Sequence, residues 1–387
     1  MAPVSIRASS PRRVVVLVSV IVLIDVCFFS AVAPLLPSYV VELGLSKSQA
    51  GVLVGAYAAG TLLASLPAGW LTARRGAPRV LVSGLLLLAV ASVAFGVGSS
   101  FVVLAGARLL QGVGGAASWA AGLTWLVQEA PRERRGQMIG TVLGAGVAGA
   151  IGGPVLGALA HASSPRLVFN VVGIVALGLA AAVVLTPSRK HTPQEGTLRQ
   201  ALRQPAVRVG AWLTVLPAMY FGVAGVLVPL RLDELGLGAT GVAVVFLCAA
   251  AVEAAGSPLV GRLSDHFGRL LPLRAGLGGV LGGCLLLPLP GRAVLLAVVV
   301  VFAAAMSGML MTPASALLSD GAEAAGLPQG LAFGLFNLAW AAGQGIGSAG
   351  GSRFAESVGD TASYLAVAVL SAATLAVLIV RAPTGVR

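Results

Sequence analysis

The sequence predicts an all-α polytopic membrane protein, with twelve transmembrane helices in two six-helix bundles. Hydrophobic residues make up 57% of the 387 residues, and charged residues only 10%. Apolar runs of about twenty residues, the length that crosses a bilayer as a helix, recur along the whole chain. The short alternating segments of a membrane β-barrel are absent from the sequence, so helices are the remaining way to satisfy the backbone in lipid.

The apolar runs fall into two groups of six, separated by a polar stretch that contains SRKHTPQEGTLRQ. We therefore expect a first bundle at residues 1–185, a linker at 186–208 and a second bundle at 209–387. The expected spans are 14–37, 49–72, 79–97, 101–127, 137–159, 167–185, 209–230, 240–263, 274–289, 293–318, 330–350 and 362–381.

The net charge of +12 does not indicate nucleic-acid binding, because the basic residues sit in short loops between apolar runs. Alternate loops carry several arginines or lysines and the loops between them carry at most one, which predicts that both termini are cytoplasmic. The loop after the tenth span is the exception, because Asp320 and Glu323 make it acidic. We expect a multi-pass protein of the inner (plasma) membrane, monomeric, in contact with lipid.

Cys27, Cys248 and Cys284 lie in apolar runs without metal-ligand spacing, so neither a metal nor another cofactor is expected.

The two halves of the sequence repeat each other. Residues 69–76, GWLTARRG, match residues 261–268, GRLSDHFG, at an offset of 192 residues. A set of glycines repeats at an offset of 194, with Ser348 in the place of Pro154. Because each half has an even number of spans, this is a parallel repeat, which is typical of transporters. The repeated glycines are Gly140, Gly149, Gly153 and Gly157 in the fifth span, and Gly334, Gly343, Gly347 and Gly351 in the eleventh.

The glycines of the fifth span predict a close helix contact. Gly149, Gly153 and Gly157 form one slowly drifting stripe, whereas Gly140 lies on the opposite face. A glycine stripe lets a neighbouring backbone approach closely. Pro154 interrupts the hydrogen-bond ladder of the helix and favours a kink beside the stripe.

The chain resembles the major facilitator superfamily over nearly its whole length. GRLSDHFGR at 261–269 is similar to the loop motif of that superfamily, and RLLQGVGGA at 108–116 resembles its fourth-span motif. The fifth-span glycines are similar to the antiporter motif of the twelve-span drug:proton antiporter branch, except that Ala158 replaces its final glycine. Asp25 followed by Pro34 and Pro37 also resembles the first span of that branch. Ala73 stands where the superfamily usually has aspartate in the first-half loop.

The resemblance implies that the fifth and eighth spans, and the second and eleventh, meet across the two halves. We therefore expect each glycine stripe to pack against the opposite bundle, where the two halves rock, with Pro154 shaping the first-half seam.

Asp25, in the middle of the first span, is the first candidate for proton coupling. An ionised carboxylate at that depth costs about 2.5–3.5 kcal/mol, so it should face a cavity or a partner. Phe28 and Phe29 follow it by three and four residues, and a carboxylate beside aromatic rings suits an amphipathic cation or a proton. The alternative is a structural aspartate paired with Arg108. Arg108 in turn either holds and releases this carboxylate or anchors an anionic substrate, with Gln111 on the same face.

Glu253 in the eighth span is either a second protonation site or a residue that joins helices, and Phe246 shares its face. Further polar and aromatic residues at cavity depth are candidates for the substrate pocket. Asn337, Trp340 and Gln344 share a face of the eleventh span, where they either line the pocket or pack against a helix. The full pocket prediction is Phe28, Phe29, Tyr57, Gln111, Trp119, Tyr220, Phe246, Asn337, Trp340 and Gln344.

The matching loops after the second and eighth spans predict a cytoplasmic gate. Gly268 permits a left-handed turn in a short connection, and Asp265 can cap the following turn and pair with Arg269. Acids after the fourth and tenth spans can accept the loop arginines when that side is closed. The alternative is that these loops serve only chain geometry and orientation. The predicted gate comprises Gly69, Arg75, Gly76, Arg79, Glu129, Gly261, Asp265, Gly268, Arg269 and Asp320.

Together these features predict proton-coupled efflux of a small amphipathic compound, cationic or neutral, by alternating access. One rival keeps the fold but makes the protein an importer, or an exporter of a sugar, siderophore or anionic metabolite. The other rival is a transport-silent sensor or an intramembrane enzyme. Against an enzyme, the sequence has no nucleophile–base pair or paired histidines.

Overall fold

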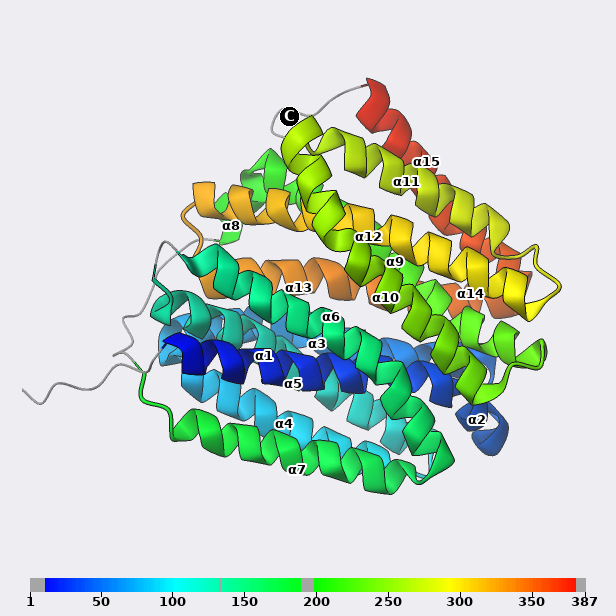
Figure 1. Ribbon diagram of the computed structural model, residues 1–387, viewed down its shortest axis with the longest axis horizontal. Helices are drawn as coiled ribbons and strands as arrows, with labels where there is room; N and C mark the ends of the chain where they lie inside the picture. Colours follow the sequence, from blue (N-terminus) through cyan, green and yellow to red (C-terminus); the bar gives the residue numbers. More distant parts are fainter. Residues whose placement is uncertain (1–10, 132–133, 189–197, 381–387) are drawn as a thin grey trace, which may run out of the picture.

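The computed structural model describes residues 11–131, 134–188 and 198–380 and contains one layered bundle of long helices. In Figure 1 the first half of the chain fills the lower part of the bundle and the second half the upper part. The elements, in order, are α1 (Pro11–Ser30), α2 (Val32–Leu43), α3 (Lys47–Arg75), α4 (Ala77–Val97), α5 (Phe101–Glu129), α6 (Arg135–Ala162), α7 (Pro165–Val184), α8 (Leu198–Arg203), α9 (Pro205–Glu234), α10 (Gly238–Phe267), α11 (Leu270–Leu286), α12 (Ala293–Ala324), α13 (Gln329–Gly345), the π-helical segment η2 (Ile346–Gly350), α14 (Gly351–Val358) and α15 (Asp360–Val380).

Ten helical stretches in the described residues are long and apolar enough to cross a membrane. The first of these joins α1 and α2 into one span of 33 residues. α11, with 17 residues, is a shorter apolar helix, and α13, η2 and α14 together form the expected eleventh span. The all-helical fold predicted from the sequence is therefore confirmed.

The connections between spans are short and use local chemistry to end the helices. Gly44, in the left-handed conformation with φ 60°, ends α2, and Ser46 and Gln49 cap the start of α3 reciprocally. Gly76 and Gly268 both have positive φ, 88° and 77°, in the two matching turns. The expectation that residues 261–267 form a loop is wrong, because α10 continues to Phe267 and only Gly268 and Arg269 connect it to α11.

The two halves meet along the helix pairs that the resemblance implied. α3 packs on α13, and α6 packs on α10. A Cβ placed on Gly69 would lie 2.6 Å from the carbonyl oxygen of Gly330, so the backbones of α3 and α13 touch there. Near the other end of α3, a Cβ on Gly55 would lie 2.7 Å from the hydroxyl of Ser348 in η2. The second and eleventh spans thus stay in contact along most of their length.

The glycine stripes do not pack against the opposite bundle, and that expectation is wrong. In α6, a Cβ on Gly149 would lie 2.6 Å from the carbonyl oxygen of Leu23 in α1. Gly157 faces Ala31 and Pro34, which also belong to the first half. A Cβ on Gly140 would meet nothing within 4 Å, as expected for the opposite face of the helix. The stripe therefore joins the fifth span to the first span of the same bundle.

The eleventh span repeats this contact within the second half. Gly343 and Gly347 lie against the carbonyl oxygens of Val215 and Met219 in α9. These two residues follow Leu23 and Cys27 by 192 residues, so the same glycine-to-carbonyl seam occurs in both halves. Where α6 carries Pro154, the eleventh span adopts the π-helical segment η2. Each seam is thus flanked by a local departure from the regular α-helical ladder.

The expected linker at 186–208 is partly helical. α8 lies within it, and α9 begins at Pro205, earlier than the expected residue 209. The boundaries 1–185 and 209–387 remain a prediction.

Candidate functional site

Asp25 lies in α1, at the centre of a group of buried side chains from three helices. It is 1% exposed. The hydroxyl of Tyr57 in α3 and the indole Nε1 of Trp119 in α5 both donate hydrogen bonds to its Oδ2, at 3.2 Å and 3.1 Å. The other oxygen, Oδ1, has no hydrogen-bond partner in the described part of the chain. One oxygen of the carboxylate is therefore held by fixed donors, and the other is buried with its hydrogen-bonding capacity unused, so it can accept a proton or a donor from a ligand.

Gly115 in α5 makes room for this arrangement. A Cβ on Gly115 would lie 3.1 Å from both carboxylate oxygens of Asp25 and 2.8 Å from the Tyr57 hydroxyl. Gly112, one turn earlier, lies against the backbone carbonyl of Tyr57. The glycines of the fourth-span motif thus bring α3 close to α5 and leave space for the aspartate.

Arg108 is fully buried on the same helix, one turn before Gln111. Its Nη1 donates a hydrogen bond to Gln111 Oε1, and its guanidinium carbon lies 5.1 Å and 5.4 Å from the ring centroids of Tyr57 and Phe29. Among the described residues, Asp25 and Arg108 form no ion pair within 4.0 Å. The structure does not contain the expected direct pairing of the two, and rings and an amide hold the arginine instead.

The aromatic rings around Asp25 and Arg108 come from both halves of the protein. Phe29 of α1 lies 4.7 Å from Tyr57 and 5.5 Å from Trp340 of α13, measured between ring centroids. Trp340 is also 6.1 Å from Tyr57. The two halves therefore meet at an aromatic group directly beside the buried carboxylate. We call Asp25, Tyr57, Trp119, Phe29 and Trp340 the central cluster.

Phe28 does not belong to the central cluster, although it was expected in the same pocket as Phe29. Its ring is fully buried, 5.0 Å from Phe169 and 5.5 Å from Phe95. Adjacent helix positions lie about 100° apart, so Phe28 and Phe29 flank Asp25 on opposite sides. Phe28 is a core residue of the first half.

Two polar residues on the face of α13 that carries Trp340 have buried atoms that are not fully hydrogen-bonded. Gln344 is 2% exposed, and its Oε1 has no partner in the described part of the chain. The same holds for the side-chain Nδ2 of Asn337. Buried polar atoms of this kind are usually satisfied by water or a ligand, so this face remains a candidate for the pocket lining.

The remaining pocket candidates lie apart from the central cluster. Tyr220 is 2% exposed in the core of the second half, with its ring 5.4 Å from Phe221. Phe246 is half-buried at the edge of that core. Glu253 faces Gly308 of α12, where a Cβ would lie 2.7 Å from its Cγ. The structure does not bring these three residues to Asp25. The assignment of Tyr220 and Phe246 to one pocket with the central cluster is therefore corrected, and Glu253 stays a separate candidate for protonation or for a contact between helices.

At the predicted gate, an ion pair of 2.8 Å joins Arg269, in the connection between α10 and α11, to Asp320 near the end of α12. In the first half, Arg75 and Arg79 are exposed at the matching turn, and Glu129 is 2% exposed at the end of α5. The surroundings of Gly261 and the side chain of Asp265 lie outside what the structure describes. Sequence reasoning missed a second pair, Lys47 with Asp360 at 2.8 Å, which joins the two halves at the opposite end of the bundle.

A scan against protein families matches the Major Facilitator Superfamily model to residues 18–343 and 218–387, which together cover nearly the whole chain. The chain belongs to the Major Facilitator Superfamily. As a member of this superfamily it is a multi-pass membrane protein that carries out secondary transport of a small molecule, and it is not an enzyme.

Curated relatives of this major facilitator protein are distant. The MFS-type transporter SLC18B1 of Homo sapiens is 27% identical over 360 residues, 86% of this chain and 77% of that protein. The quinolone resistance protein NorA of Staphylococcus aureus (strain MRSA252) is 31% identical over 167 residues, 43% of this chain and 42% of that protein. The MFS-type transporter ppzB of Metarhizium rileyi is 34% identical over 105 residues, which cover only 22% of its length.

A solved structure of a transporter has the same fold as this chain. A bacterial homolog of the human lysosomal transporter Spinster, in its inward-facing and unoccupied conformation, superposes with a TM-score of 0.74 at 16% sequence identity. The match covers 95% of this chain and 96% of that one.

Proposed function

We propose that this major facilitator protein exports a small amphipathic compound, cationic or neutral, in exchange for protons. The observation that carries the proposal is the central cluster. It places one buried carboxylate, with an oxygen that lacks a hydrogen-bond partner in the described residues, beside rings from both halves. A carboxylate surrounded by aromatic faces suits an organic cation, because charge and ring contacts act on the same ligand.

In the proposed mechanism, the proton and the substrate compete for Asp25. Tyr57 and Trp119 hold Oδ2 in a fixed orientation, so the competition takes place at Oδ1. A proton neutralises the carboxylate and releases the substrate, and loss of the proton allows the next substrate to bind. One proton that moves through ~100 mV supplies ~2.3 kcal/mol, nearly fifty-fold in concentration, which is sufficient for useful export. Glu253, away from this cluster, remains a candidate for a second proton or for a contact between helices.

The proposed movement is a rocking of two bundles, residues 1–185 and 209–387, about the central cluster. The contacts across the halves, α3 with α13 and α6 with α10, are where the movement occurs. We propose that the arginine-rich connections at Gly76 and Gly268 and both termini face the cytoplasm of a cell whose plasma membrane holds the protein as a monomer. The Arg269–Asp320 ion pair then belongs to the cytoplasmic gate, together with its first-half counterpart at Glu129.

The similarity to NorA, a quinolone resistance protein, supports placement in the drug:proton antiporter branch, as do the fifth-span glycines. The rival function is transport of an anion anchored by Arg108. Tyr57, Phe29 and Gln111 already surround that guanidinium, whereas Asp25 Oδ1 has no hydrogen-bond partner in the described residues and still needs one.

The test uses purified full-length protein in liposomes that contain a pH-sensitive dye. After a pH gradient is imposed, cationic, neutral and anionic compounds are added in turn. We expect proton movement with cationic or neutral compounds, and its loss in Asp25→Asn. Proton movement only with anions would overturn the assignment, and full coupled transport by Asp25→Asn would remove Asp25 from the mechanism. Asp233→Asn, at an exposed position near the end of α9, is the matched control.

A further inference from the structure

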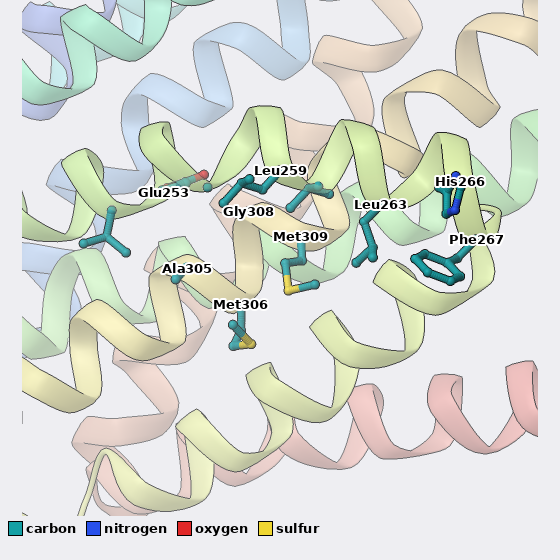
Figure 2. A pocket seen from close by; sticks show the side chains of 12 residues that line it. Glu253, Leu259, Leu263, His266, Phe267, Ala305, Met306, Gly308 and Met309 are labelled. Carbon is teal, nitrogen blue, oxygen red and sulfur yellow. The ribbon is translucent and has the colours of Figure 1, made fainter.

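A groove lies between α10 and α12 in the second half, away from the central cluster. Its volume is about 570 Å³, within the range of sites for drug-sized molecules. Figure 2 shows Glu253 towards one end of the groove, His266 and Phe267 at the other, and Met306 and Met309 beneath them. Leu259 and Phe267 are each 64% exposed, so the groove opens on the apolar outer surface of the bundle.

The groove exists because the two halves differ at one helix contact. In the first half, the backbones of α3 and α5 touch at Gly60 and Gly112, and Thr61 donates a hydrogen bond to the Gly112 carbonyl at 3.2 Å. Val252 follows Gly60 by 192 residues, and Glu253 follows Thr61 by the same number. A branched side chain and a carboxylate thus replace the glycine and the small hydroxyl that close the contact. α10 and α12 cannot approach in the same way.

The walls of the groove favour a particular ligand chemistry. Glu253 is the acidic side chain in its lining, and Gly308 leaves space for it, since a Cβ there would lie 3.3 Å from Oε1. Met306 and Met309 are flexible and polarisable, and such side chains adapt to ligands of different shapes. The rest of the lining is largely apolar. A ligand with an apolar body and a positive centre matches both features, whereas a lipid phosphate would lie next to a carboxylate.

We propose that this groove is a second binding site for an amphipathic cation, entered from the apolar layer of the bilayer, with Glu253 as the counter-ion of the positive centre. The proposal rests on the substrate class of the proposed function but uses a different carboxylate from a different half. A site of this kind collects the compound from the membrane before it reaches the central cluster.

Equilibrium binding of radiolabelled tetraphenylphosphonium to the full-length protein in phosphatidylcholine nanodiscs tests the proposal. We expect two molecules bound per wild-type protein, one in Asp25→Asn, and none in the double variant Asp25→Asn/Gly256→Phe. Gly256 lines the groove, and a Cβ there would meet nothing within 4 Å, so the phenyl ring fills the groove without displacing backbone. Gly178→Phe on α7, where a Cβ also meets nothing within 4 Å, is the control. It should leave both binding sites intact, with two molecules bound per protein.

A second variant tests the charge. Asp25→Asn/Glu253→Gln keeps the shape of the groove and should lower the affinity of the remaining site at least tenfold. If Asp25→Asn alone abolishes all binding, or Gly256→Phe changes nothing, the groove is not a cation site, although the central mechanism would stand. A phospholipid that Gly256→Phe displaces, detected by native mass spectrometry in place of the cation, would also overturn the proposal. If the groove binds the cation but the Asp25→Asn variant still transports, the result would instead contradict the proposed function.

Discussion

The carbonyl oxygen of Cys27 in α1 lies directly over Gly153 in α6, so close that a Cβ on the glycine would stand 2.8 Å from it. The same hypothetical atom would also collide with the side chain of Ser30. The first span carries Asp25, and therefore this contact fixes the depth and rotation of the carboxylate.

Replacement of Gly153 by valine should destabilise the first half by about 1–3 kcal/mol, because α1 must move away from α6. Gly140→Val is the matched control, since it lies on the same helix with nothing within 4 Å of its Cβ. The measurement is the melting temperature of both variants in detergent, followed by transport in liposomes. Equal melting temperatures for the two variants would contradict the close contact.

Phe29 and Phe28 should respond differently to the same substitution. Phe29→Leu removes a ring from the central cluster and should raise KM about two- to tenfold, the value of one aromatic contact, with little change in melting temperature. Phe28→Leu should leave KM unchanged and destabilise the protein by about 1–3 kcal/mol, because it opens a space between Phe95 and Phe169. The opposite pattern would show that the two rings have been assigned to the wrong sides of α1.

Gly115→Ala should abolish proton-coupled transport. The added methyl group would lie 2.8 Å from the Tyr57 hydroxyl and 3.1 Å from both oxygens of Asp25, so it displaces the carboxylate or its donor. Gly106→Ala on the same helix has open space around it and should transport normally. The comparison requires equal amounts of folded protein, judged by size-exclusion chromatography. Normal coupling in Gly115→Ala would mean that the geometry around Asp25 is not essential.

The Lys47–Asp360 ion pair should hold the two halves together at the end opposite the arginine-rich connections. It is reinforced by the backbone N–H of Ser48, which donates to Glu356 at 3.2 Å. Because both partners are about one-third exposed, each single charge reversal should cost only about 0.2–1 kcal/mol. The double variant Lys47→Asp/Asp360→Lys should recover the transport rate that the single variants lose. Failure of the double variant to recover would exclude a role for the pair in closing this end.

The sequence predicts the fold well because a bilayer permits only a few kinds of membrane-spanning structure. Length and hydropathy identify spans, and the offsets of 192 and 194 residues reveal the repeat. Periodicity along one helix also shows which residues share a face, as in the separation of Gly140 from Gly149 and Gly153. It does not identify the helix that packs on that face. The glycine stripe was therefore assigned to the wrong neighbour, although its purpose, a close backbone contact, is confirmed.

The candidate site could be predicted only in part for the same reason. Asp25 was recognisable because an acid in the middle of an apolar span is costly. Tyr57 and Trp119 were recognised as residues at cavity depth, but their hydrogen bonds to Asp25 depend on the way α3 and α5 pack on α1. The contact of Phe29 with Trp340 joins residues far apart in the chain, and no local pattern indicates it.

The glycine-to-carbonyl seams have a mechanical consequence. Because Gly149 and Gly153 lock α6 to α1, and Gly343 and Gly347 lock the eleventh span to α9, the two helices of each pair cannot slide past each other. Each such pair then moves as one rigid body, and a displacement at one end of its helices is transmitted to the other end. Binding energy released at the middle of the membrane can in this way reach both surfaces of the bilayer at once.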